Sequence, residues 1–161
     1  MTHDEFREAM TKALIAEGGT FVSTEADPWD PADEDCTNEF HPGYRTQVDF
    51  PHWIVFLSSD DDPDWNDSED EDVAFDLAAF FQHIISPNFD EANAAVADSL
   101  PEGWHFETAG EGVPGFWLST TIDFDRREDF QAIIDELIKS CNVVHERIGA
   151  WPNAPKIERL I

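Results

Sequence analysis

The sequence predicts an α+β fold, in which a single domain (residues 1–161) has a mainly antiparallel sheet with helices packed on it. The chain is long enough for such a domain, because about 150 residues bury roughly 70% of their unfolded surface. Apolar residues make up 41% of the chain and include thirteen Phe and six Trp, which is too many for a disordered acidic protein. Strand-like runs alternate with segments whose apolar residues recur at helical spacing, which favours a sheet covered by helices.

The first element is a helix that begins after Thr2. Glu5 follows three residues later and completes a capping box. Apolar residues then recur at helical spacing, at Phe6, Met10, Ala13 and Leu14. Gly18–Gly19 ends this helix. The next residues, 20–24 (TFVST), are typical of a short strand.

Two acidic loops and two strands follow. Residues 25–43 form a long loop rich in Pro, Asp and Glu. Strands are predicted over residues 45–50 (RTQVDF) and 52–58 (HWIVFLS), and Pro51 between them marks an edge, a bulge or a break, because it cannot donate to a ladder. The second loop, residues 58–72 (SSDDDPDWNDSEDED), holds nine Asp or Glu and no Lys or Arg.

The middle of the chain predicts two helices. Residues 73–85 (VAFDLAAFFQHII) are apolar nearly all round, which predicts a well-buried helix that stops at Ser86–Pro87. Asn88 with Glu91 can cap a second, short helix that continues through Val96.

A hairpin and a long helix complete the chain. Residues 104–108 (WHFET) and 116–124 (FWLSTTIDF) predict the hairpin. Asp125 and Glu128 are a capping pair for the helix, whose apolar stripe is Phe130, Ile133, Ile134, Leu137, Ile138, Cys141 and Ile148. The expected order is therefore helix, three strands, helix broken at Pro87, two strands, helix.

The negative charge is confined to part of the chain. The net charge is −27, and residues 13–125 hold 27 acidic residues with Arg45 as their one base. Residues 1–12 have a net charge of −1, and residues 126–161 have none. Solubility needs a net charge of magnitude only about 2 to 8 in a small domain, and crowded like charges destabilise the compact state. The distribution therefore favours a local function for the acidity.

The candidate site is this acidic surface, for which we expect a protein partner. Its main carboxylates are Asp60, Asp61, Asp62, Asp64, Asp67, Glu69, Asp70 and Glu71, with Asp33, Glu34 and Asp35 as a second group. Trp29 and Trp65 lie within the same two loops. Each of these Trp side chains either folds back onto the core or anchors a partner, since Trp is enriched at binding hot spots. Three further tryptophans lie in predicted strands and are expected in the core: Trp53, Trp104 and Trp117.

Two metal-site patterns are present and both are weak. Asp60, Asp62, Asp64, Asn66, Ser68 and Glu71 match the ligand positions of an EF-hand loop. Trp65 stands where that loop needs Gly, Asp67 stands at its apolar position, and the preceding residues predict a strand rather than a helix. A specific calcium site is therefore not favoured, although weak cation binding is expected.

The second pattern is a zinc site built from Cys36, His41, Cys141 and His145. Cys141 continues the apolar stripe of the last helix, so core packing is the better interpretation. In a cytosolic protein both thiols are expected to be reduced, and a single disulfide between Cys36 and Cys141 is the alternative. No metal and no cofactor is therefore predicted.

The sequence does not favour an enzyme. It contains no nucleophile elbow, phosphate-binding loop or metalloprotease helix. A nuclease must attract a polyanion, and a surface this acidic repels one. The same repulsion argues against direct binding of nucleic acid.

Two resemblances follow from these features, although neither rests on a residue motif. The element order, size and acidity resemble those of the small type III secretion chaperones and their relatives. The strong acidity without catalytic motifs resembles acidic DNA-mimic inhibitors, such as anti-restriction proteins and some phage anti-CRISPR proteins. Both resemblances imply a binding protein rather than an enzyme, and neither assigns a role to a residue.

Three hypotheses stay open. The first is a non-enzymatic DNA- or RNA-mimic inhibitor that binds the basic surface of a nucleic-acid-binding protein. The second is an acidic chaperone or adaptor with an exposed apolar sheet face. The third is a domain from a halophile, whose acidity is a salt adaptation. We expect a cytoplasmic monomer or homodimer, because the sequence shows neither a secretion signal nor a membrane span.

Overall fold

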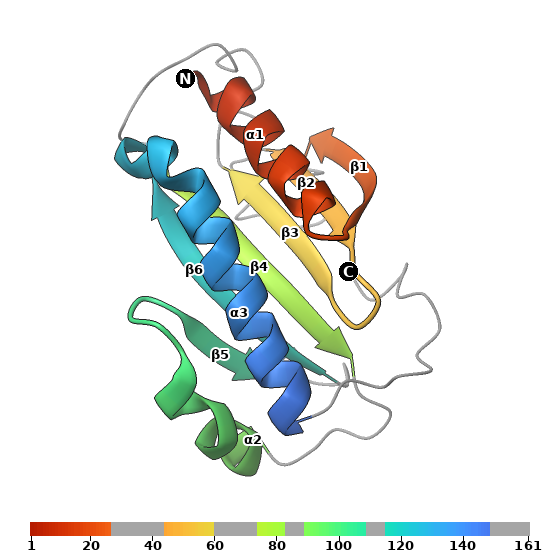
Figure 1. The fold of residues 1–161 in the computed structure, drawn as a ribbon, viewed down its shortest axis with the longest axis vertical. Helices are drawn as coiled ribbons and strands as arrows, with labels where there is room; N and C mark the ends of the chain where they lie inside the picture. Colours follow the sequence, from red (N-terminus) through yellow and green to blue (C-terminus); the bar gives the residue numbers. More distant parts are fainter. Residues whose placement is uncertain (27–43, 60–73, 83–88, 109–114, 149–161) are drawn as a thin grey trace, which may run out of the picture.

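The computed structural model describes residues 1–26, 44–59, 74–82, 89–108 and 115–148 (Figure 1). In chain order these residues form α1 (His3–Ala16), β1 (Thr20–Ala26), β2 (Tyr44–Asp49), β3 (Ile54–Ser59), β4 (Ala74–Gln82), α2 (Phe89–Val96), β5 (His105–Thr108), β6 (Gly115–Asp123) and α3 (Phe130–Ile148), with short 3₁₀ helices η2 (Ala97–Ser99) and η3 (Phe124–Asp129). The predicted α+β fold class is confirmed.

The six strands form one antiparallel sheet with the order β1-β2-β3-β4-β6-β5. Helices α1 and α3 lie on the same face of this sheet, and α2 lies beside β5 and the C-terminal half of α3 (Figure 1). Strands β1 and β5 are the two edges among the described strands.

The helix predicted over residues 73–85 is wrong, because most of this segment is strand β4. Strand β4 lies between β3 and β6 and pairs with both. Phe75 and Phe81 pack into the core below the helices, while Phe80 packs on the opposite face of the sheet. A central strand that is apolar on both faces has no alternating pattern, so its sequence cannot be distinguished from that of a buried helix by periodicity.

Helix α1 begins and ends at the residues that the local sequence signals predict. The Thr2 side chain accepts a hydrogen bond from the Glu5 backbone N–H at 3.1 Å, and the Glu5 carboxylate accepts one from the Thr2 N–H at 3.1 Å. The chain leaves the helix through Gly18, whose φ of 103° suits glycine. Gly19 lies so close to Val48 that a Cβ there would come within 2.5 Å of the Val48 side chain. The predicted capping box and helix end are therefore confirmed.

The main core lies between the sheet and the two long helices. Helix α3 contributes the predicted stripe, with Ile133, Ile134, Leu137 and Cys141 buried. Helix α3 begins at Phe130. The two residues that were expected to cap it, Asp125 and Glu128, lie instead within η3. The predicted hairpin is confirmed as β5 and β6.

A second, small apolar cluster lies on the sheet face opposite α1 and α3. It contains Ile54, Phe56 and Phe80, each at most 5% exposed, with the half-buried Trp117 packed against them. The Arg45 guanidinium lies 5.5 Å from the Phe56 ring centroid. Of the other tryptophans expected in the core, Trp53 and Trp104 are buried.

Candidate functional site

The strand register attaches both acidic segments to the same end of the sheet. Residues 27–43 connect β1 to β2, and residues 60–73 connect β3 to β4. The flanking residues Ala26, Tyr44 and Ser59 are consecutive Cα partners across the sheet, and the row continues to Phe75, the second residue of β4. Since neighbouring strands lie about 4.8 Å apart, the row is about 14 Å long. We call this row of strand ends, together with the neighbouring C-terminal end of β6 at Asp123, the acidic end.

The two acidic segments carry much of the charge of the protein. Residues 27–43 and 60–73 contain fifteen Asp and Glu and no Lys or Arg. The predicted site residues all belong to them and lie outside the described residues: Asp33, Glu34, Asp35, Asp60, Asp61, Asp62, Asp64, Asp67, Glu69, Asp70, Glu71, Trp29 and Trp65. The structure thus places the attachment points of the predicted site, not its side chains.

Exposed carboxylates among the residues that the structure describes also lie at the acidic end. Asp123 ends β6 opposite Ala74, and the following η3 carries Asp125, Glu128 and Asp129, all exposed. The first turn of α1 lies at the same end of the molecule as the tips of β3 and β6, and carries the exposed Asp4 and Glu5 (Figure 1). These carboxylates were not among the predicted site residues, because they are far in sequence from the two acidic segments and only the fold brings them to the same end.

Two of the arginines near this end are engaged with the protein itself. Arg7 is 4% exposed, donates to the Ser59 hydroxyl at 3.3 Å and pairs with Asp4 at 3.3 Å. Arg127 donates to the Phe124 carbonyl at 3.0 Å, and its guanidinium lies 4.9 Å from the Phe124 ring centroid. These cations hold the fold together, whereas the carboxylates around them face outward.

An aromatic cluster supports the acidic end from below. His3, Phe6, Phe75 and Phe124 are all fully buried. The His3 ring meets Phe124 edge-on at 4.2 Å between centroids, and Phe6 meets Phe75 at 4.9 Å. Edge-to-face contacts of this kind add to the stabilisation from buried area. The acidic end is therefore built on a packed platform that ties α1, β4 and η3 together.

The opposite end of the sheet has a different character. The β2–β3 turn, residues 50–53 (FPHW), contains no Asp or Glu. Its His52 ring stacks on His145 of α3 at 4.2 Å, with an interplanar angle of 11°. The pKa of His145 is lowered, mainly because burial disfavours the charged ring and secondarily because of the charge on His52. The stack thus joins the turn to the end of α3.

The zinc pattern is incomplete in the described residues. Cys141 has no exposed surface and belongs to the core cluster, as its place in the stripe predicted. Burial raises the pKa of its thiol well above the usual range, which disfavours the thiolate that zinc needs. Cys36, His41 and the EF-hand ligand positions lie outside the described residues. Within the described residues, no three His, Cys, Asp or Glu side chains form a group that could hold a metal.

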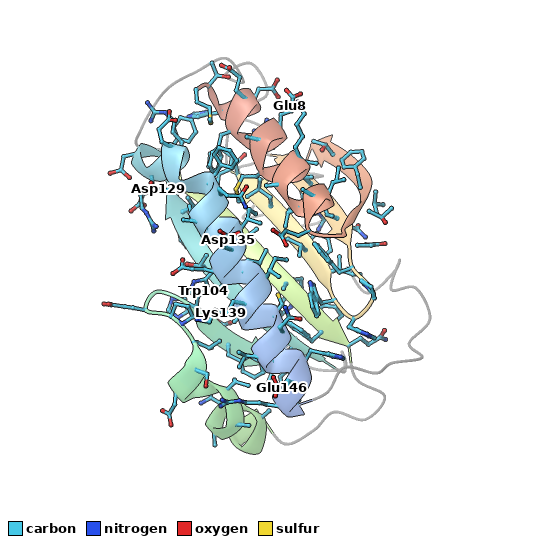
Figure 2. The ribbon with its side chains drawn as sticks, in the orientation of Figure 1. Glu8, Trp104, Asp129, Asp135, Lys139 and Glu146 are labelled. Carbon is cyan, nitrogen blue, oxygen red and sulfur yellow. The ribbon has the colours of Figure 1, made fainter. Side chains whose placement is uncertain are left out.

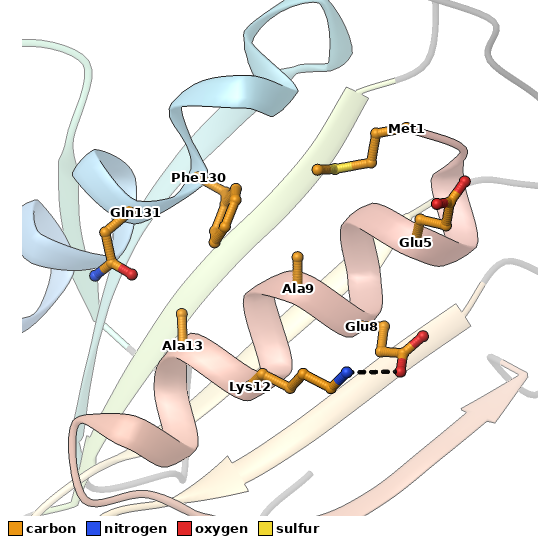
Figure 3. Close-up of a pocket in the computed structure, with 8 residues that line it drawn as sticks. All are labelled: Met1, Glu5, Glu8, Ala9, Lys12, Ala13, Phe130 and Gln131. Carbon is orange, nitrogen blue, oxygen red and sulfur yellow. Dashed lines mark ion pairs between the residues drawn. The ribbon is translucent and has the colours of Figure 1, made fainter.

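A hollow of about 460 Å³ lies between α1 and the start of α3 (Figure 3). Ala9, Ala13 and Phe130 line its apolar side, and Glu8 pairs with Lys12 at 3.1 Å on its rim. Glu5 is occupied in the capping box, and the hydrogen bond from the Thr2 backbone N–H lowers its pKa. The charged groups of this hollow are therefore already paired or capped.

The helix layer as a whole carries mixed charge. Along α3, Asp135, Lys139 and Glu146 succeed one another on the outer surface (Figure 2). Because cations interrupt the acids here, α3 offers no continuous negative face.

No protein-family model matches the chain, and neither the curated proteins nor the solved structures show a significant match. Among the described helices, none is long and apolar enough to span a membrane. The resemblances to chaperones and to DNA mimics thus stay predictions.

Proposed function

We propose that the protein is a non-enzymatic, strongly acidic inhibitor that imitates nucleic acid and binds the basic groove of a nucleic-acid-binding protein. The observation that carries this proposal is the row of strand ends from Ala26 to Phe75, to which both acidic segments attach. This shared attachment supports a single concentrated negative surface rather than charge spread over the whole protein.

The amount of charge suits such a role. Duplex DNA carries about one charge per 1.7 Å of its axis, or two per base pair. The fifteen carboxylates of the two acidic segments therefore equal the charge of roughly seven to eight base pairs. A protein that reads DNA through Lys and Arg would be attracted at long range and would bind in a salt-sensitive way.

The location of the charge also separates this proposal from salt adaptation. A halophile surface gains from acid on all sides, whereas here two segments hold fifteen of the 36 acids and residues 126–161 have no net charge. The chaperone hypothesis needs a bare apolar sheet face. The apolar cluster on the face opposite the helices is at most 5% exposed at Ile54, Phe56 and Phe80.

Affinity capture with a nucleic-acid competitor tests the proposal. The immobilised protein is exposed to a cell lysate at about 0.1 M salt, where surface charges act over about 10 Å. Bound proteins are then challenged with excess duplex DNA, or with an uncharged polymer as the control competitor. We expect recovery of a DNA- or RNA-binding protein that DNA releases and the uncharged polymer does not. Recovery only of proteins that are indifferent to DNA would contradict the proposal.

A further inference from the structure

The exposed apolar side chains of the described residues gather at one place. Ile15, Phe21 and Val22 are 45%, 46% and 47% exposed, and they are the large hydrophobic residues with the most solvent contact in the described part of the chain. Ile15 lies in the last turn of α1, and the other two lie in β1, which the Glu17–Gly19 turn joins directly to α1. All three belong to the end of α1 and the start of β1, at this edge of the sheet, and we refer to them as the β1 patch.

Strand β1 is also an open edge. Among the described strands it pairs with β2 alone, so the backbone groups on its other side face outward. The register shifts between Phe21 and Ser23, which leaves Val22 without a partner residue on β2. Val22 therefore lies at an irregularity of the edge strand and has an exposed apolar side chain.

The other edge of the sheet is protected in the usual way. Strand β5 has only four residues, and its exposed positions include the charged Glu107. Short, charged edge strands discourage pairing with another chain. Strand β1 has seven residues. Each edge strand carries one Glu, Glu25 in β1 and Glu107 in β5, so the two edges differ in length and in apolar exposure.

The charge around β1 indicates what kind of chain would pair with it. Residues 13–26 contain two charged side chains, Glu17 and Glu25, and Arg45 on β2 is the Cα partner of Glu25. Acids surround the β1 patch, because Glu17 is exposed and Asp49 is the Cα partner of Thr20. A second copy of the protein, with a net charge of −27, would be repelled. A cationic segment would be attracted.

We propose that the outer edge of β1 is a docking site for an extended, Lys/Arg-containing segment of a partner protein, which adds a strand beside β1 and packs apolar side chains on Phe21 and Val22. Added strands gain affinity from main-chain hydrogen bonds and specificity from alternate side chains. The C-terminal residue of β1, Ala26, belongs to the acidic end, so a strand beside β1 runs toward that surface. This second surface goes beyond the proposed inhibitor function and does not depend on it.

Hydrogen exchange on the ¹⁵N-labelled full chain tests the proposal. The probe is a nine-residue peptide that alternates Val and Lys, with blocked ends, at 0.15 M salt. The control peptide has the same charge and has Pro in place of the central Val residues, which prevents strand pairing. We expect the Val/Lys peptide to slow amide exchange within residues 20–26 by at least about tenfold at saturation, which corresponds to ~1.4 kcal/mol. Strand β5 should be unaffected, and so should β1 with the Pro peptide.

Two variants of one exposed residue separate strand docking from simple charge attraction. Val22→Lys and Val22→Glu both remove the apolar side chain but change the local charge in opposite directions. Strand docking predicts that both variants lose most of the protection. Full protection in Val22→Glu would show attraction of the cationic peptide by charge alone and would overturn the proposal. Equal protection of β5, or no protection of either strand, would also overturn the proposal. So would protection of β1 that grows with protein concentration in the absence of peptide, because it would indicate pairing with a second copy of the protein.

The two proposals can fail separately. Val22→Glu leaves every acidic side chain in place, so release of a captured partner by DNA should persist in this variant if the acidic end is the inhibitory surface. Loss of the β1 effect alone would leave the acidic-end proposal standing.

Discussion

The acidic end and the opposite end of the sheet are made from the same strands but present different chemistry. The acidic end receives two segments with fifteen Asp and Glu and no base. At the opposite end, the β2–β3 turn has no acid, and His52 stacks on His145 at 4.2 Å. In an antiparallel sheet, successive connections alternate between the two ends. The β1–β2 and β3–β4 connections therefore share one end, and the β2–β3 turn lies at the other.

The difference between the two ends shows that the net charge of −27 says less about the surface of the protein than the points at which the two acidic segments join the sheet. The acids are spread over much of the sequence, yet strand pairing brings the attachment points of the densest segments into one row. The following predictions test whether the two ends differ in stability and electrostatics as this arrangement requires.

The largest expected effect comes from breaking the aromatic platform under the acidic end. Phe75 has no exposed surface, and its ring lies 4.9 Å from that of Phe6 and 5.6 Å from that of Phe124. We expect Phe75→Ala to lower the free energy of unfolding by about 3–5 kcal/mol, because it leaves a cavity. Urea denaturation measures this change. Phe21→Ala is the control, since Phe21 is half exposed, and an equal loss there would contradict the account.

The buried cation at the acidic end should have the next largest effect. Arg7→Met removes the donor to Ser59 and the charge beside Asp4. We expect a loss of about 2–3 kcal/mol in the free energy of unfolding, since hydrogen bonds from charged groups contribute about 1.5–3 kcal/mol each. Lys12→Met is the matched control. Its pair with Glu8 is exposed on both sides, so its loss should be no more than about 0.5 kcal/mol.

Neutralising one acidic segment should stabilise the fold at low salt. The test variant changes the nine acids of residues 60–72 to Asn or Gln, and a control variant neutralises nine acids elsewhere. The control positions are Glu17, Asp49, Asp90, Glu91, Asp98, Glu107, Glu111, Glu136 and Glu146. Concentrated charge repels itself more strongly than dispersed charge.

The thermal midpoint of the test variant should rise by roughly 2–4 °C at low ionic strength, equivalent to about 1 kcal/mol, and depend less on NaCl. The control variant should change less. Equal stabilisation by the two variants would mean that the acids are not concentrated at one end.

The smallest effect concerns the histidine stack at the opposite end. The pKa of His145 is lowered in the folded protein, so the unfolded chain binds the proton more readily. Stability from this residue is therefore present above the ordinary His pKa of about 6.5 and is lost as the pH falls below it toward the lowered folded value. Urea denaturation at pH 7.5, 6.5 and 5.5 should show that His145→Gln removes this part of the pH dependence. An unchanged pH dependence in His145→Gln would contradict this expectation.

The elements with local signals were predictable from the sequence. The Thr2–Glu5 capping box and the apolar stripe of α3 need only residues within a few positions of each other, and both are present. The strand and hairpin predictions succeeded for the same reason. The acidic character of the site was also clear, because it follows from composition alone.

The return of the second acidic segment to the same end of the sheet could not be predicted, because it depends on β4. With a helix over residues 73–85, the second acidic segment would run from a strand to a helix, and its position relative to the sheet would be undefined. The row from Ala26 to Phe75 appears only once β4 pairs with β3. The stack of His52 on His145 joins residues far apart in sequence, and no local pattern encodes such a contact.

The central claim is that the position of the acids at one end, not their number, produces binding. The most direct test measures the affinity of the DNA-releasable partner for the wild type and for the two equally charged variants described above, at 0.1 and 0.3 M salt. We predict that the variant neutralised over residues 60–72 binds at least about tenfold more weakly at 0.1 M, or ~1.4 kcal/mol, with a shallower salt dependence, while the dispersed control stays within about threefold of the wild type. Equal weakening of both variants would show that only the total charge matters and would contradict the account.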